Sequence, residues 1–84
     1  MYQVKIKERA QKDMKKLAPS FRARIVTAIR SLANEPRPSG AKKLTAKEEW
    51  RFRLSDYRIL YIIDDENKSV TIVRIKHRRE VYRY

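Results

Sequence analysis

The fold of this chain is decided by residues 50–63, which read WRFRLSDYRILYII. Apolar and basic residues alternate over residues 50–54, a pattern typical of a half-buried strand. Ser55-Asp56 can form a tight turn, and residues 57–63 run back as a second strand that is too apolar for the edge of a sheet. We therefore predict a β-hairpin at the centre of the fold.

The segments on either side of the hairpin predict two helices and further strands. The spacing of apolar residues changes from two in the first segment to three or four from Glu8 onward. Pro19 ends the first helix, and Ser20 is the expected N-cap of the second. The expected strands are residues 2–7, 50–54, 57–63 and 70–75, with a weak signal at 42–44, and the expected helices are residues 8–18 and 21–32.

These elements indicate the fold class. Their order is β-α-α-β-β-β, with one more strand if residues 42–44 pair. We predict an α+β fold in which an antiparallel sheet carries a helical hairpin packed on one face. A chain of 84 residues leaves no room for a second domain, so residues 1–84 are expected to form a single one.

The composition excludes several classes of protein. The chain has no cysteine, which excludes disulfides, thiolate metal sites and a cysteine nucleophile. Its single histidine, His77, cannot build a metal centre of several histidines. No apolar run approaches the roughly 18 residues that a membrane span needs, and no signal peptide is evident. We expect a cytoplasmic protein without metal or cofactor.

The charge points to the kind of partner. Lysine and arginine number 22 against 10 acidic residues, which gives a net charge of +12. A basic surface can serve solubility alone, but solubility needs less charge, and self-repulsion opposes compaction. This imbalance favours nucleic acid as a partner, with an acidic protein as an overlapping candidate and a membrane surface as a minor one.

The hairpin brings three arginines to one face of the sheet. A two-residue loop sets Arg53 opposite Arg58 and leaves Arg51 on the same side. Like charges in opposite positions destabilise a sheet, and an anion between them removes the conflict. Guanidinium groups grip phosphate through paired donors. The sequence therefore predicts a phosphate-binding site on this face.

The register of the last strand decides where Arg74 and Lys76 lie. A loop of three or five residues after Ile63 places both on the arginine face. The other face then holds apolar residues, namely Trp50, Phe52, Ile59, Tyr61, Val73 and Ile75. A loop of four or six residues instead buries Arg74 among apolar neighbours. We prefer the first register because it separates charge from core.

The basic tail, KHRREVYRY at residues 76–84, supplies groups that could do chemistry. Histidine exchanges a proton readily near neutral pH, so His77 is a candidate general acid or base. Tyr82 could donate a proton or stack on a base, and Arg78 could bind phosphate. Taken alone, the tail could also be a charged, solvated turn.

In order and spacing, the chain resembles the RelE/ParE toxin superfamily over nearly its whole length. Within it, the chain resembles the RelE-like ribosome-dependent messenger-RNA endonucleases. The matching segments are AQKDMKKL at 10–17, EPRP at 35–38, KL at 43–44, WRFRL at 50–54, DYRILY at 56–61 and HRREVY at 77–82. Each is weak alone, and together they are specific for the superfamily. The resemblance implies a RelE-like fold and an acidic RelB-like antitoxin, with operator DNA bound only through that antitoxin.

The resemblance also implies a catalytic surface on the sheet. Its expected catalytic residues are Arg51, Arg53, Arg58, His77, Arg78 and Tyr82. The expected RNA-binding residues are Arg51, Arg53, Arg58, Arg74, Lys76, Arg78, Arg79 and Arg83. Positions 51 and 53 are commonly lysine in the family, and arginine can hold a phosphate but cannot take a proton. Proton transfer is then assigned to His77 and Tyr82, with Glu48, Glu49 or a ribosomal group as alternatives.

The expected activity is metal-independent cleavage of messenger RNA in the ribosomal A site. The 2′-OH attacks the adjacent phosphate, which gives a 2′,3′-cyclic phosphate and a 5′-OH end. Two alternatives stay open. One is a ParE-like inhibitor of DNA gyrase, in which the basic cluster is incidental. The other is an RNA-binding RelE homologue that lost activity with the lysine replacements.

Overall fold

The computed structural model describes residues 1–45 and 47–81. Its elements are β1 (Gln3–Ile6), α1 (Glu8–Lys15), α2 (Pro19–Ser31), β2 (Lys42–Lys43), β3 (Trp50–Leu54), β4 (Tyr57–Asp64), β5 (Ser69–His77) and α3 (Arg78–Val81). The α+β class and the predicted order of elements are confirmed, including the short strand near residue 42. The tail adds one helical turn, α3. Within the described ranges, no helix is long and apolar enough to cross a membrane.

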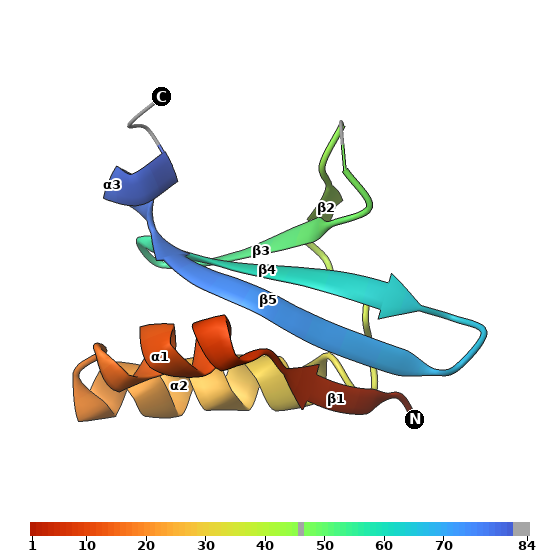
Figure 1. The fold of residues 1–84 in the computed structure, drawn as a ribbon, viewed down its shortest axis with the longest axis horizontal. Coiled ribbons are helices and arrows are strands. Elements are labelled where there is room, and N and C mark those ends of the chain that lie inside the picture. Colours follow the sequence, from red (N-terminus) through yellow and green to blue (C-terminus); the bar gives the residue numbers. More distant parts are fainter. Residues whose placement is uncertain (46, 82–84) are drawn as a thin grey trace.

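The strands form one five-stranded sheet in the order β1-β5-β4-β3-β2, and β4 lies inside the sheet, as predicted for a strand too apolar for its edge. Helices α1 and α2 cover one face of the sheet, and α3 rises on the opposite side (Figure 1). The sheet is mixed rather than wholly antiparallel, because β1 runs parallel to β5. No turn connects these two strands, so nothing local in the sequence fixes their relative direction.

The hydrophobic core lies between the two long helices and the sheet. The largest fully buried side chains are Tyr61, Ile25, Leu32, Ile59, Ile72 and Val70. Each large apolar side chain of this kind stabilises the fold by about 1.5–3 kcal/mol relative to an exposed position. Trp50 and Phe52 pack against the core, as predicted for the apolar face of the hairpin. The core therefore occupies one face of the sheet, and the other face carries basic side chains together with Leu60 and Ile62.

A bulge in β5 decides which of its residues face the core. Tyr61 pairs with Ile72, whereas Leu60 pairs with Arg74, so Val73 is an extra residue on β5. Between the β4–β5 turn and the bulge, Ile63 pairs with Val70, which is the register with a six-residue loop that we did not prefer. Beyond the bulge, Leu60 pairs with Arg74, so the side chains face as in the register that we preferred. Ile72 consequently takes the buried position predicted for Val73, and each simple register holds over only half of the strand.

The junction between the two helices differs from the prediction in one detail. Helix α2 begins at Pro19 with Ala18 as N-cap, so the expectation that Ser20 is the N-cap was wrong. A proline at the first helical position costs no hydrogen bond, because an amide there would lack an intrahelical partner. Arg22 then donates to the carbonyls of Met14 (3.0 Å), Lys15 (3.3 Å) and Leu17 (3.0 Å). It thereby ties the start of α2 to carbonyls at the C-terminal end of α1 and in the junction that follows.

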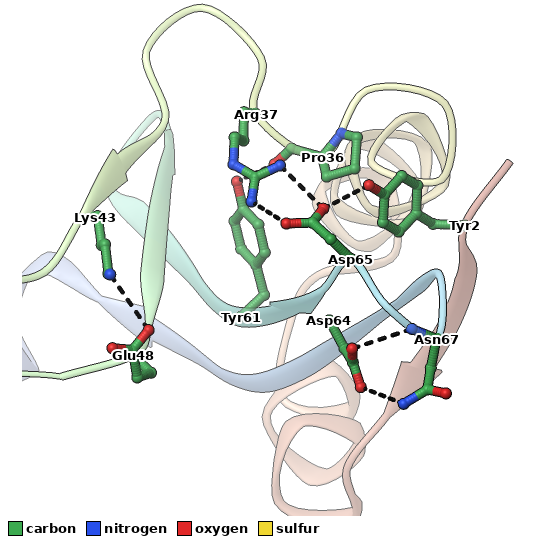
Figure 2. A network of polar contacts seen from close by, with 9 residues as sticks. All are labelled: Tyr2, Pro36, Arg37, Lys43, Glu48, Tyr61, Asp64, Asp65 and Asn67. Atoms are coloured by element: carbon green, nitrogen blue, oxygen red, sulfur yellow. Dashed lines mark hydrogen bonds and ion pairs between the residues drawn. The ribbon is translucent and has the colours of Figure 1, made fainter.

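The loop before β2 is held against the β4–β5 turn, as Figure 2 shows. Arg37 donates to both carboxylate oxygens of Asp65 (3.2 and 2.7 Å), and the Tyr2 hydroxyl donates to Asp65 Oδ1 (2.5 Å). The bonds from Arg37 and then Tyr2 lower the pKa of Asp65 to about 2. The buried Tyr61 hydroxyl donates to the Pro36 carbonyl (2.8 Å). These bonds fix the path of the chain into β2.

Candidate nucleic-acid interface

The sheet face opposite the two long helices carries a row of basic residues. Arg53 pairs with Arg58, Arg58 pairs with Lys76 on the next strand, and Arg51 pairs with Lys42. Cross-strand partners project to the same side of a sheet, so these five residues share one side. We call Lys42, Arg51, Arg53, Arg58 and Lys76 the basic face. The predicted hairpin register, with Arg53 opposite Arg58, is confirmed.

A pocket of about 240 Å³ opens at the hairpin end of the basic face, and its lining includes Arg53, Arg58 and Arg78. The β3–β4 turn supplies the rest of the lining, Ser55 and Asp56. Arg78 is held there because its backbone N–H donates to the Asp56 carbonyl (2.6 Å). Its guanidinium Nη1 lies 3.9 Å from Asp56 Oδ1, an exposed ion pair that an incoming phosphate could replace at small cost.

Ser55 adopts a φ of 56°, in the left-handed region. The tightest hairpin turns need such a conformation, because it matches the twist of the flanking strands. The short turn keeps Arg53 and Arg58 directly opposite each other and places Asp56 where it can hold Arg78. The geometry of the pocket therefore depends on the length of this turn.

Arg51 presents a donor that lacks a partner. Its Nε is buried and has no hydrogen-bond acceptor among the residues that the structure describes. A buried donor left unsatisfied costs about 1–3 kcal/mol. The site therefore holds cations opposite one another and a buried donor without an acceptor, and a bound phosphate group would relieve the repulsion between the cations.

The structure does not bring His77 to this cluster. Strand β5 continues through His77, so alternation places His77 on the opposite face from its neighbour Lys76. His77 pairs with Tyr57, with the ring centroids 4.9 Å apart in an edge-on contact. Its Nδ1 accepts a hydrogen bond from the Arg79 N–H (3.1 Å). His77 does not lie with the arginines as expected, because β5 ends two residues beyond the predicted end at Ile75.

Arg74 also differs from the expectation. Its guanidinium binds the Asp13 carboxylate of α1, with Nε–Oδ2 and Nη2–Oδ1 distances of 2.8 and 3.1 Å. Its charge is therefore compensated within the protein rather than offered to a ligand. Glu48, an alternative proton acceptor, lies 3.2 Å from Lys43 Nζ in an ion pair (Figure 2). Arg79 is exposed on α3, and the expected site residues Tyr82 and Arg83 lie outside the described residues.

Sequence reasoning missed Lys42 as a member of the basic face. The only signal was the weak strand at residues 42–44. Pairing of β2 with β3 decides the matter, because it sets Lys42 opposite Arg51 and Lys43 opposite Trp50. Two adjacent lysines thus face opposite sides, and only the register separates their roles.

The sequence and the fold match a known class of protein. The family model described as "ParE toxin of type II toxin-antitoxin system, parDE" matches residues 4–82. The chain therefore belongs to the ParE toxin family and is a type II toxin of the RelE/ParE superfamily. The resemblance found in the sequence is confirmed.

Individual relatives are RelE-type toxins. Toxin RelG of Mycobacterium tuberculosis is 39% identical over 85 residues, spanning 98% of this chain and 97% of the relative. A chain of the toxin–antitoxin complex RelBE2 from Mycobacterium tuberculosis superposes with a TM-score of 0.82 at 34% identity, covering 90% of this chain and 96% of that one. The archaeal RelE–RelB complex from Pyrococcus horikoshii OT3 gives 0.79 at 28% identity, covering 92% and 94%.

Proposed function

We propose that this toxin is an endoribonuclease that cleaves messenger RNA in the ribosomal A site and so inhibits translation. The observation that carries the proposal is the row of Arg53, Arg58 and Lys76 across three neighbouring strands, beside a pocket that Arg78 lines. An RNA backbone offers phosphates at regular spacing, and guanidinium is the side chain best shaped to bind them. The RelE-type relatives support the same activity.

The reaction begins when the 2′-oxygen attacks the adjacent phosphorus and its proton passes to a base. The bond from phosphorus to the 5′-oxygen then breaks, and that oxygen takes up a proton. The products are a 2′,3′-cyclic phosphate and a 5′-OH end. The transition state carries extra negative charge on the phosphate oxygens, which Arg51, Arg53, Arg58 and Arg78 stabilise. Each well-placed donor contributes about 2.7–4 kcal/mol to such a step.

Proton transfer needs a different kind of side chain, because arginine stays protonated. In this proposal it falls to Tyr82 and to Lys76, which is the partner of Arg58 across β4 and β5. A lysine ammonium can donate a proton and its neutral amine can accept one, a tyrosine hydroxyl can donate one and its phenolate can accept one, and a positioned acid or base accelerates a reaction by about 10²–10⁴. His77 has no part in this step because it packs against Tyr57 on the helix-facing side.

The proposal includes three partners in the cytoplasm. The ribosome orients the message, and its RNA attracts a surface of net charge +12. An acidic RelB-like antitoxin binds the toxin and neutralises this charge, and the pair binds operator DNA through the antitoxin. The RelBE2 and archaeal RelE–RelB structures each hold a toxin with an antitoxin, which supports this assignment.

The test is an in vitro translation reaction in which the ends of the message are mapped. Wild-type toxin should cut the message, and the double variant Arg58→Ala, Arg78→Ala should not. Arg24→Ala with Arg30→Ala is the matched control, because it removes two exposed charges from α2. Intact message with wild type, or equal cutting by the Arg58/Arg78 variant, would contradict the proposal. Filter binding of RNA without cutting would indicate a non-catalytic RNA-binding homologue.

A second candidate function is inhibition of DNA gyrase, and the match to the ParE family model favours it. The basic face would then be incidental to the activity. A supercoiling assay separates the two functions. Inhibition of gyrase that survives the Arg58→Ala, Arg78→Ala substitution would support the ParE-like function. Normal supercoiling in the presence of excess toxin would rule it out.

A further inference from the structure

Helix α1 has many charged residues, and Asp13 is unusual among them because its side chain is buried against β5. Its side chain is only 9% exposed, and it accepts two hydrogen bonds from the Arg74 guanidinium. A third bond comes from the backbone N–H of Ile75 to Oδ2 (2.9 Å). Burial alone would raise the pKa of this carboxyl, but the bonds from Arg74 and Ile75 outweigh it, so the pKa is lowered. Asp13 is therefore an anion held by β5.

The contact lies at a weak point of the sheet. Strand β1 ends at Ile6, opposite Ile72, and the Lys7 N–H makes the next bond to the Ile72 carbonyl (3.0 Å). Beyond that point α1 runs beside β5 in place of a strand (Figure 1). The bulge at Val73 also interrupts the pairing with β4 there. Asp13 satisfies the Ile75 N–H on this edge, which an adjacent strand would otherwise do.

The residues that follow this contact belong to the basic face. Lys76 is directly next to Ile75 and pairs with Arg58, and Arg78 lines the pocket two residues later. Beyond the bulge, β5 is paired with β4 on one side, and on the other side Asp13 takes the place of a neighbouring strand. A shift there would move Lys76 and Arg78 relative to Arg58.

We propose that Asp13 is a positioning residue for the basic face: by holding Arg74 and the Ile75 amide, it fixes the end of β5 so that Lys76 and Arg78 lie beside Arg58. Arg74 then serves the site through Asp13 and does not bind RNA. The expected effect on cleavage rests on the proposed nuclease function. The fixed position of residues 74–78 does not, and it can be measured separately.

The experiment compares Asp13→Asn with Glu8→Gln in the full-length toxin. Both remove one carboxylate from α1, but Glu8 is exposed and, among residues 1–45 and 47–81, its ion-pair partner is Lys12, 3.8 Å away on the same helix. Amide hydrogen exchange reports the position of residues 74–78 without reference to activity. Asp13→Asn should lower protection there about tenfold, as expected for a lost hydrogen bond to a charged group. Glu8→Gln should leave it unchanged.

Cleavage is measured on the same variants in the translation reaction. Displacement of a catalytic group by about 1 Å can cost on the order of a hundredfold in rate, and we expect a loss of this size in kcat for Asp13→Asn. Binding of an RNA that carries a 2′-deoxy group at the cut site should change much less, because Arg51, Arg53 and Arg58 lie on β3 and β4, whereas the hydrogen bonds of Asp13 go to β5. If Asp13 only stabilised the fold, Asp13→Asn would lower kcat and RNA binding together.

Two further variants guard against misfolding of Asp13→Asn. Arg74→Lys keeps the charge but loses the paired geometry. Asp13→Asn with Arg74→Met removes both charges and leaves no buried ion unpaired. Both should fold and cleave slowly. Wild-type cleavage by either, or wild-type protection of residues 74–78 in Asp13→Asn, would overturn the proposal. Failure of the wild type itself to cleave would instead refute the proposed function, and the exchange data would still test Asp13.

Discussion

Arg53 lies directly opposite Arg58 across β3 and β4, and Lys76 lies opposite Arg58 on β5. Three cations therefore form one row across β3, β4 and β5, near the β3–β4 turn. Like charges in opposite positions destabilise a sheet, so the row opposes folding of the free protein. When a phosphate chain is bound, the same three charges attract it and stabilise the complex. Stability and binding should consequently respond in opposite directions when one member of the row is neutralised.

Arg53→Gln tests that relationship. At low salt we expect the variant to be more stable than wild type by about 0.2–1 kcal/mol, because one repulsion is removed. The gain should shrink at high salt, where the charges are screened, and RNA affinity should fall. Denaturant unfolding at two ionic strengths and filter binding measure these effects, with Arg30→Gln at an exposed position of α2 as control. A loss of stability at low salt would contradict the prediction.

The adjacent residues Lys76 and His77 face opposite sides and should behave differently. Lys76→Arg keeps the charge, so RNA binding should persist while cleavage falls by about 10²-fold, the loss expected when proton transfer is removed. His77→Ala should lower stability by about 0.5–1.5 kcal/mol through the lost contact with Tyr57, and should leave cleavage by the folded protein unchanged. Unfolding and end-mapped cleavage are measured on both. If His77→Ala slowed cleavage and Lys76→Arg did not, His77 would be the residue that transfers the proton.

Asp65 should make stability sensitive to acid. Hydrogen bonds from Arg37 and then Tyr2 lower its pKa from 3.8 to about 2. The folded state therefore holds this proton less tightly than the unfolded state, and the contribution to stability is present above about pH 4 and lost as the pH falls toward 2. Thermal unfolding of Asp65→Asn should vary less over this range than that of wild type. Glu66→Gln, in the same turn, should keep the wild-type dependence.

Tyr61→Phe should loosen the loop that leads into β2. The substitution leaves the buried Pro36 carbonyl without its donor, which costs about 1–3 kcal/mol. Burial raises the pKa of Tyr61 to about 12, so the contribution of its protonated hydroxyl is complete below about pH 10 and is lost as the pH rises toward 12. Tm measured against pH should show this loss in wild type and not in Tyr61→Phe. Tyr57→Phe, on the same strand and face, is the control.

Local patterns in the sequence predicted much of the fold. The two-residue turn at Ser55-Asp56 fixed the hairpin pairing, because so short a loop allows only one register. Alternation then assigned Arg51, Arg53 and Arg58 to one side. The bulge at Val73 could not be predicted in this way, since the strand pattern on each side of it suits a different register. Nor could the parallel pairing of β1, whose partner lies more than sixty residues along the chain.

The same division holds at the candidate site. The sequence by itself determined the charge, the family and the arginine pair of the hairpin, because these depend on composition and on contacts between near neighbours. Only the tertiary structure decided that Lys42 joins the basic face, that His77 leaves it, and that Arg74 turns to Asp13. Each of these depends on how segments distant in the chain pair and pack. Such pairing is set by burial of the whole core, which no local window contains.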